Sequence, residues 1–193
     1  MSYIELIGTI TGFLAVYLAT KNNMITWVIG MINIVCFSIL FYQIHLYGDL
    51  VLQVFYLIMN IYGWIRWSNV SNPLPITDNS IKEKVLIITV IVTLGLISGY
   101  VFNNLHLWFP NLIQHPASFA YIDGLIMIGS MTATFLTTKR KIFNWILWLI
   151  LDTISVYIFI KKQVPLMAVE YFLFDILALY GWLNWRKEMN NNV

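Results

Sequence analysis

Charged residues are scarce in this chain. They make up 10% of its 193 residues, whereas 60% are hydrophobic. A water-soluble domain carries about 25% charged residues, because its surface must be solvated. The composition therefore excludes an ordinary soluble domain and predicts a membrane protein. The net charge of +2 is also too small to indicate a nucleic-acid partner.

Other absences exclude particular chemistries. The one cysteine, Cys36, lies in an apolar run, so the chain has neither a disulfide framework nor a cysteine-based metal site. The three histidines lack ligand spacing, so we expect no metal. No nucleotide-binding loop of the form G-x-x-x-x-G-K-[ST] is present, so we expect no ATP-driven step within the chain and no cofactor.

Hydrolase motifs are absent as well, since neither G-x-S-x-G nor H-E-x-x-H occurs. We therefore do not expect an enzyme. An intramembrane enzyme or a sensor stays open as an alternative class, because Asp123 and Asp152 both lie in apolar stretches where they could meet.

Long apolar stretches are what the chain does have. A helix needs about 20 mostly apolar residues to cross the hydrocarbon core of a bilayer. Seven stretches qualify, beginning at Ile4, Met24, Leu46, Val85, Pro116, Ile142 and Val164. An open strand would leave backbone polar groups unsatisfied in lipid, so these stretches predict helices. The predicted fold class is an all-α integral membrane protein with seven transmembrane helices.

Basic residues give the orientation of these spans. One side of the predicted membrane carries Lys21, Arg66, Lys82, Lys84, Lys139, Arg140, Lys141, Arg186 and Lys187, and the other carries only Lys161 and Lys162. The positive-inside rule places the first group in the cytoplasm. We therefore expect the N-terminus outside and the C-terminus inside.

The sequence contains a repeat. Residues 61 to 67 read IYGWIRW and residues 179 to 185 read LYGWLNW. Trp27 and Trp145 are 118 positions apart, as are Gly63 and Gly181, and no gap is needed to align the copies. This interval predicts an internal duplication that covers roughly residues 3–67 and 121–185.

Each repeat holds three spans, and one span lies between the repeats. The second triplet then has the same orientation as the first, which predicts parallel repeats with a substrate site at their interface. We expect residues 1–68 to form the first repeat, residues 69–115 a loop, linker helix and outer loop, and residues 116–193 the second repeat and tail.

Polar residues within spans usually face the interior of a helix bundle and mark a pathway. Several form stripes with aromatic residues, a mixture that suits a planar, partly cationic solute with hydroxyl groups. The predicted substrate-binding residues are Asn33, Phe37, Gln53, Tyr56, Asn60, Trp148, Asp152, Ser155, Glu170, Tyr171 and Asp175. Ser130 and Thr134 are further candidates on the fifth span. The alternative is that the amides and hydroxyls hold helices together.

The repeated aromatic phrase ends the third span of each triplet. Its fixed spacing favours a gate at the cytoplasmic end of the path, formed by Trp64, Trp67, Trp182 and Trp185. An interfacial aromatic belt is the alternative.

The stretches IGMINIVCFSILFYQIHLYGDLVLQVFYLIMNIYGWIRW and NWILWLILDTISVYIFIKKQVPLMAVEYFLFDILALYGWLNW resemble the PnuC family of bacterial vitamin transporters. The resemblance covers nearly the whole chain. It implies a three-plus-one-plus-three helix plan in the bacterial inner membrane and a homotrimer. It also implies facilitated diffusion of nicotinamide riboside, with trapping by cytoplasmic phosphorylation. Thiamine is the alternative solute.

One departure from the family pattern concerns charge. Riboside transporters of this kind often have Asn where Asp152 stands and an uncharged residue near Asp175. Extra acid favours a cation, but nicotinamide riboside and thiamine are both cations, so the identity of the vitamin stays open.

Overall fold

The computed structural model describes residues 3–43, 47–68, 74–111, 119–161, 163 and 165–191. Within these ranges the chain forms seven α-helices, which confirms the predicted all-α class. They are α1 (Tyr3–Thr20), α2 (Ile25–Gln43), α3 (Tyr47–Trp67), α4 (Ile81–Trp108), α5 (Ala120–Thr138), α6 (Phe143–Lys161) and α7 (Pro165–Asn191). The predicted span starts at Leu46, Pro116 and Val164 lie outside the described residues.

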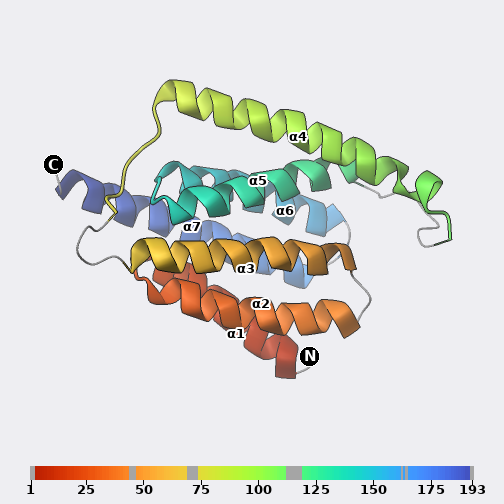
Figure 1. The fold of residues 1–193 in the computed structure, drawn as a ribbon, viewed down its shortest axis with the longest axis horizontal. Helices are drawn as coiled ribbons and strands as arrows, with labels where there is room; N and C mark the ends of the chain where they lie inside the picture. Colours follow the sequence, from red (N-terminus) through yellow and green to blue (C-terminus); the bar gives the residue numbers. More distant parts are fainter. Residues whose placement is uncertain are drawn as a thin grey trace.

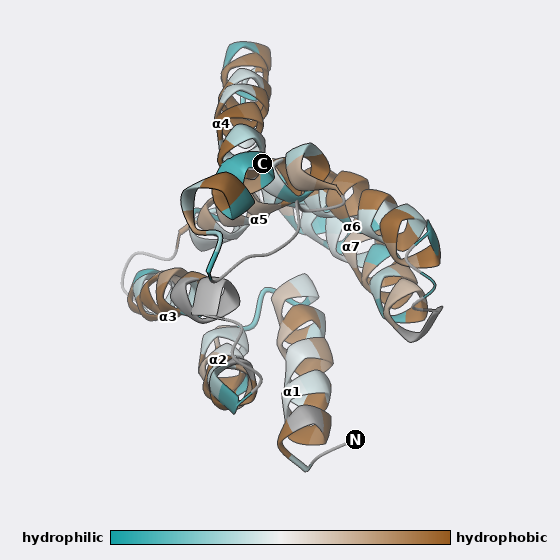
Figure 2. Cartoon of the chain, turned by 90° about the vertical axis from the view of Figure 1, so that its right-hand side faces the viewer, coloured by the Kyte–Doolittle hydropathy of each residue, from teal (hydrophilic) through white to brown (hydrophobic). Residues whose placement is uncertain are grey.

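Three of the described helices, α4, α5 and α6, are each long and apolar enough to cross a membrane. Helices α1 and α2 contain shorter apolar stretches, Leu6–Thr20 and Ile25–Leu40. Helix α4 is the least buried of the three long ones, and Figure 2 shows it largely hydrophobic and projecting from the rest of the bundle. An exposed apolar helix of this kind is stable only in lipid or against another apolar surface.

Helix α4 begins earlier than predicted. The predicted span starts at Val85, but α4 already begins at Ile81. A capping box explains the difference, because the Ser80 hydroxyl accepts from the Glu83 N–H while the Glu83 carboxylate accepts from the Ser80 N–H. At the other end the helix continues to Trp108, and the Asn104 side-chain amide donates to the Tyr100 carbonyl. Asparagine therefore does not break the helix there.

The helices lie roughly along one direction, with the chain termini at opposite ends of the bundle (Figure 1). Helix α1 packs on α2 and α2 on α3, and likewise α5 packs on α6 and α6 on α7. The two groups meet through α1 against α7 and α3 against α5. Helix α4 packs on α5, where Gly95, Gly99 and Gly124 bring the two backbones close together.

The turns after α1 and α5 have the same local geometry. Asn22 and Arg140, 118 positions apart, both have positive φ, at 54° and 51°. The N–H of Asn23 donates to the Leu18 carbonyl at 3.0 Å, and the N–H of Lys141 donates to the Leu136 carbonyl at 3.0 Å. Both turns are Schellman motifs, which end a helix with a residue in the left-handed region. The two turns, which lie 118 positions apart, thus have the same backbone conformation. We refer to the end of the bundle that carries these two turns as the turn end.

Candidate functional site

A cavity of about 840 Å³ lies between the two groups of helices. Its lining residues come from α1, α2, α3, α5, α6 and α7, whereas α4 contributes none. The cavity runs from Ala19 and Ala178, near the turn end, to Leu40 and Met167, near the opposite end. Each three-helix group therefore supplies one wall of the same space.

Nearly all of the predicted substrate contacts meet around this cavity. Those that line it are Asn33, Phe37, Gln53, Tyr56, Asn60, Trp148, Asp152, Ser155, Glu170 and Tyr171. Ser130 and Thr134 line it too. The sequence interpretation missed Phe13 and Phe174, whose rings stack with centroids 4.6 Å apart and join α1 to α7 at the cavity. The repeat could have indicated Phe174, because it lies 118 positions after Tyr56.

Asp175 is the predicted contact that does not line the cavity. Its carboxylate instead accepts a hydrogen bond from the Thr153 hydroxyl at 3.1 Å, joining α7 to α6. Asp123, which lies near the start of α5, is not among the lining residues either. The structure therefore does not place Asp123 with Asp152 in one site.

The ionisable side chains of the cavity lining are both acids. Asp152 is only 5% exposed and Glu170 is half-buried, and both line the cavity. None of the lining residues is Lys, Arg or His. Among the described residues, no group of three His, Cys, Asp or Glu side chains could hold a metal ion. Because buried carboxylates without a cationic partner are costly, these two acids favour a positively charged ligand.

Two of the amides make hydrogen bonds within the protein, and that of Asn33 joins two helices. The Asn33 side-chain amide donates to the Gly8 carbonyl at 2.7 Å, which joins α2 to α1. The Asn60 amide donates to the Tyr56 carbonyl of its own helix at 2.9 Å. A Cβ at Gly30 would overlap the Asn60 side-chain oxygen, so glycine is needed for α2 and α3 to approach here. These asparagines thus line the cavity with fixed orientations.

Aromatic rings cover much of the remaining wall. Tyr171 stacks on Phe159 with centroids 5.3 Å apart and an interplanar angle of 13°. Tyr171 also meets Phe174 edge to face at 6.3 Å. Phe37, Tyr56 and Trp148 complete the aromatic lining. Rings and acids in one space can bind a flat cationic group by stacking and by charge.

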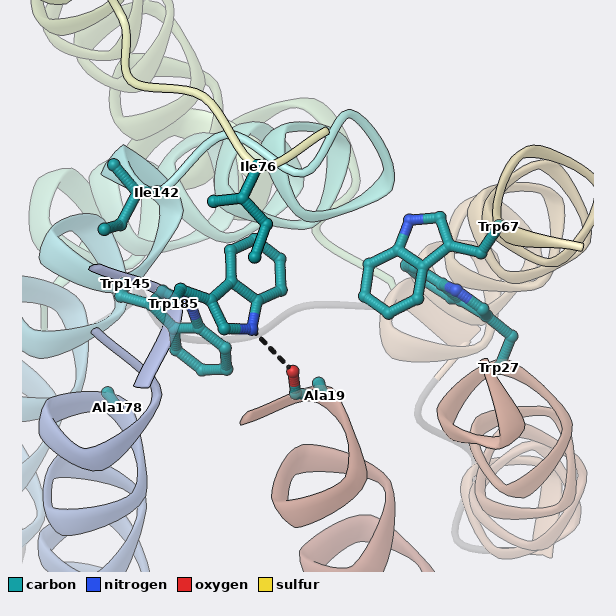
Figure 3. Close-up of a cluster of buried hydrophobic side chains, with 8 residues drawn as sticks. All are labelled: Ala19, Trp27, Trp67, Ile76, Ile142, Trp145, Ala178 and Trp185. Carbon is teal, nitrogen blue, oxygen red and sulfur yellow. Dashed lines mark hydrogen bonds between the residues drawn. The ribbon is translucent and has the colours of Figure 1, made fainter. Parts of the chain in front are cut away.

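An aromatic cluster closes the turn end of the cavity (Figure 3). We call it the seal, and its buried members are Ala19, Trp27, Trp67, Ile76, Ile142, Trp145, Ala178 and Trp185. Four of these residues, Ala19, Trp27, Trp145 and Ala178, also line the cavity. The seal is therefore the floor of the cavity.

Equivalent residues of the two repeats make equivalent contacts in the seal. Trp27 and Trp67 meet edge to face at 5.1 Å, and Trp145 and Trp185 meet in the same way at 5.4 Å. The Trp67 indole N–H donates to the Thr138 carbonyl of α5 at 3.2 Å. The Trp185 indole N–H donates to the Ala19 carbonyl of α1 at 2.9 Å, as Figure 3 shows. Each repeat is thus hydrogen-bonded to the other.

The glycine of the repeated phrase makes room for this packing. A Cβ at Gly63 would lie 2.5 Å from the Trp27 ring, and a Cβ at Gly181 would lie 2.7 Å from the Trp145 ring. Any side chain at these positions would push the tryptophan away. The glycine of the phrase therefore leaves space for the indole of Trp27 or Trp145. The second tryptophan of the phrase, Trp67 or Trp185, supplies the indole that bonds to the other group of helices.

The four tryptophans predicted to form a gate lie in two different environments. Trp67 and Trp185 are 5% and 0% exposed and lie inside the seal. Trp64 is 42% exposed and Trp182 is half-buried at the edge of the seal, where the Arg186 guanidinium lies over its ring at 5.1 Å. Only the second tryptophan of each phrase therefore closes the cavity.

A multi-pass helical membrane protein whose two groups of helices enclose a cavity with polar and aromatic side chains, closed at one end by a seal, has the architecture of a membrane transporter. The comparisons agree with this class. The family model of the nicotinamide mononucleotide transporter matches residues 2–187, and the chain belongs to this family.

Curated relatives cover almost the whole chain. The nicotinamide riboside transporter PnuC of Escherichia coli (strain K12) is 33% identical, over 97% of this chain and 88% of the relative. PnuC of Neisseria mucosa is 20% identical, over 96% and 73%. The riboflavin/roseoflavin transporter RibM of Streptomyces davaonensis is 21% identical, over 94% and 83%. The prediction of a PnuC-type chain is confirmed.

A solved structure has the same fold. The crystal structure of the vitamin B3 transporter PnuC superposes with a TM-score of 0.73 at 19% sequence identity, covering 100% of this chain and 84% of that one. This agreement confirms the all-α fold class.

Proposed function

We propose that this protein carries nicotinamide riboside into the bacterial cell across the cytoplasmic membrane. The observation that carries the proposal is the cavity between the repeats, which combines two acids with aromatic rings and contains no basic residue. Nicotinamide riboside is a flat pyridinium cation with hydroxyl groups, and such a ligand matches this lining. The relative with 33% identity is a nicotinamide riboside transporter, which supports the same solute.

The proposed mode of transport is facilitated diffusion. The sequence contains no nucleotide-binding loop that would power the step. We propose that phosphorylation in the cytoplasm then traps the solute, since an added phosphate would meet the acids of the cavity on the way out. The basic residues near the turn end favour its location at the cytoplasmic face, with the N-terminus outside and the C-terminus inside. A homotrimer is also proposed, on the family resemblance alone.

Other vitamins are the second candidates. Thiamine has the same charge as nicotinamide riboside, and a relative of this chain, RibM, is a riboflavin/roseoflavin transporter. Riboflavin is uncharged, so it would gain no charge–charge attraction from Asp152 and Glu170. The acids of the cavity therefore favour a cationic vitamin over riboflavin.

Uptake into vesicles that contain only this protein tests the proposal. We expect labelled nicotinamide riboside to equilibrate across the vesicle membrane without ATP or an ion gradient, and unlabelled thiamine and riboflavin to compete less well. Protein-free vesicles are the control. An absence of uptake for every vitamin tested would leave an intramembrane enzyme or a sensor as the better account.

A further inference from the structure

The two repeats match in the seal but differ along the cavity above it. In the seal, Trp27 corresponds to Trp145 and Trp67 to Trp185, at the interval of 118. Along the cavity, each amide of the first repeat corresponds to a residue without an amide or a charge. Asn33 corresponds to Leu151, Gln53 to Tyr171 and Asn60 to Ala178.

The acids, by contrast, lie in the second repeat and correspond to apolar residues of the first. Asp152 of the second repeat corresponds to Ile34, which also lines the cavity, and Glu170 corresponds to Leu52. The cavity therefore has two walls of different chemistry. The wall from α2 and α3, which we call the amide wall, carries Asn33, Gln53 and Asn60. The wall from α6 and α7, which we call the acid wall, carries Asp152 and Glu170.

Hydrogen bonds fix the polar groups of the amide wall. The amides of Asn33 and Asn60 each donate to a backbone carbonyl, at 2.7 Å and 2.9 Å, so one donor of each is already used. These two bonds do not use the second N–H or the side-chain carbonyl oxygen of either amide, groups that can bond the hydroxyl or amide groups of a solute. These asparagines carry no net charge and distinguish a hydrogen-bonding group from an apolar one.

The acid wall differs because it carries ionisable side chains. None of the residues that line the cavity is Lys, Arg or His, so the lining offers no basic partner to Asp152 or Glu170. Asp152 is nevertheless 5% exposed, so little water reaches it. In such surroundings a unit charge on a ligand interacts much more strongly than it does in water.

We propose that the two walls recognise different parts of one solute, which binds in a single orientation. The acid wall binds the positively charged ring, and the amide wall binds the uncharged hydroxyl-bearing part. A cavity with two identical walls would bind the solute equally well in two orientations related by the axis between the repeats. This inference rests on the proposed function, because it assigns the parts of a pyridinium nucleoside to residues of the same cavity.

Two probes that differ in charge but keep the same sugar and carboxamide separate the walls. They are nicotinamide riboside, which is a cation, and its 1,4-dihydropyridine form, which is neutral. The dissociation constant of each probe is measured by calorimetry on the purified protein. The readout is the ratio of the two constants, neutral over cationic, which reports the preference for the charged aromatic ring over its neutral reduced form.

We expect Asp152→Asn to lower this ratio at least tenfold. Glu170→Gln is an independent second variant on the same wall and is expected to lower the ratio at least threefold. Gln53→Leu on the amide wall should weaken both probes together, so that the ratio changes less than twofold. If neither acid substitution lowers the ratio, or if Gln53→Leu lowers it as much as they do, the assignment of the walls is wrong. Failure of the unmodified protein to bind either probe would instead refute the proposed function.

Discussion

The two tryptophans of each repeated phrase lie in different environments, although the spacing of the phrase is the same in both copies. Trp67 and Trp185 are buried in the seal and bond to the opposite repeat. Trp64 is exposed, and Trp182 lies at the edge of the seal beneath Arg186. Of the four tryptophans predicted to form a gate, only Trp67 and Trp185 lie inside the seal. Substitutions can separate these two positions from Trp64 and Trp182.

Replacing Trp185 by Phe keeps most of the ring but removes the N–H that donates to the Ala19 carbonyl. We expect the unfolding free energy to fall by more than about 0.5–1.5 kcal/mol, the usual value of one hydrogen bond, because the smaller ring also leaves a cavity at a position that is 0% exposed. We also propose that the seal acts as a gate, and on that proposal the transport rate should change more than the affinity. Trp64→Phe is the matched control and should stay within about 0.5 kcal/mol. Equal effects of the two variants on denaturant unfolding would show that Trp185 has no special position.

Glycine at the centre of the phrase can be tested in the same way. Gly181→Ala would put a Cβ 2.7 Å from the Trp145 ring, and the ring is too tightly packed to move freely. Overpacking of this kind costs typically about 1–3 kcal/mol. The corresponding change Gly63→Ala against Trp27 should have a similar effect. A thermal-unfolding midpoint unchanged by both substitutions would contradict the packing described for the seal.

Among the elements of the structure, the connection between α3 and α4 adds a contact that the repeat does not contain. We call residues 74–80 the strap. Its Thr77 pairs with the α5–α6 turn, since the Thr77 N–H donates to the Arg140 carbonyl at 3.1 Å and the Ile142 N–H donates to the Thr77 carbonyl at 2.9 Å. The Arg140 guanidinium donates to the Leu74 carbonyl at 2.6 Å and lies over the Trp67 ring. These bonds hold Ile76 against Trp185 in the seal (Figure 3).

The side chain of Ile76 is 6% exposed, so we expect it to contribute to the stability of the seal. We expect Ile76→Ala to destabilise the protein by about 2–5 kcal/mol if the space stays empty, and by less if the seal closes around it. Ile81→Ala, at a position that is 74% exposed in the first turn of α4, is the control and should cost below about 0.5 kcal/mol. Similar unfolding curves for the two variants would mean that the strap does not contribute to the seal.

Hydropathy was sufficient to predict the helices but not all of their ends. Spans of apolar residues predict one helix each, because the bilayer requires it. The start of α4 depends on the Ser80 capping box, whose residues look like part of a polar loop. The strap could not be predicted, since Ile76 lies between prolines and polar residues and has no periodic pattern that indicates burial.

For the molecule as a whole, most of the polar residues predicted to bind a solute line one cavity, because polar residues in apolar spans face an interior. Asp175 is the exception. Its neighbour Phe174 and the later Ala178 line the cavity, whereas Asp175 points to α6 and meets Thr153. Successive side chains on a helix differ in direction by about 100°, so Phe174 faces the cavity and Asp175 does not. A pattern of mixed polar and aromatic residues does not show which of two neighbours faces inward.

The acids of the cavity predict weak binding of phosphorylated solutes. Although the family is described by the mononucleotide, the cavity lining contains two acids and no basic residue to meet a phosphate. We expect nicotinamide riboside at 100 times its Kd to raise the stability by about 2.7 kcal/mol, and the mononucleotide at the same concentration to raise it much less. Thermal-shift measurements with each compound test this. Equal shifts would mean that the acids do not face the solute.

The most direct test of the central claim, that the cavity between the repeats carries a cationic nucleoside, compares two acids at mid-membrane. Asp152 lines the cavity and Asp175 does not. Initial uptake of labelled nicotinamide riboside is measured below saturation in vesicles, with equal amounts of Asp152→Asn, Asp175→Asn and unmodified protein. We expect Asp152→Asn to lower uptake by about 5- to 150-fold, corresponding to a loss of about 1–3 kcal/mol for a charged contact, and Asp175→Asn to lower it less than about twofold. Equal losses in the two variants, or unchanged uptake in Asp152→Asn, would contradict the claim.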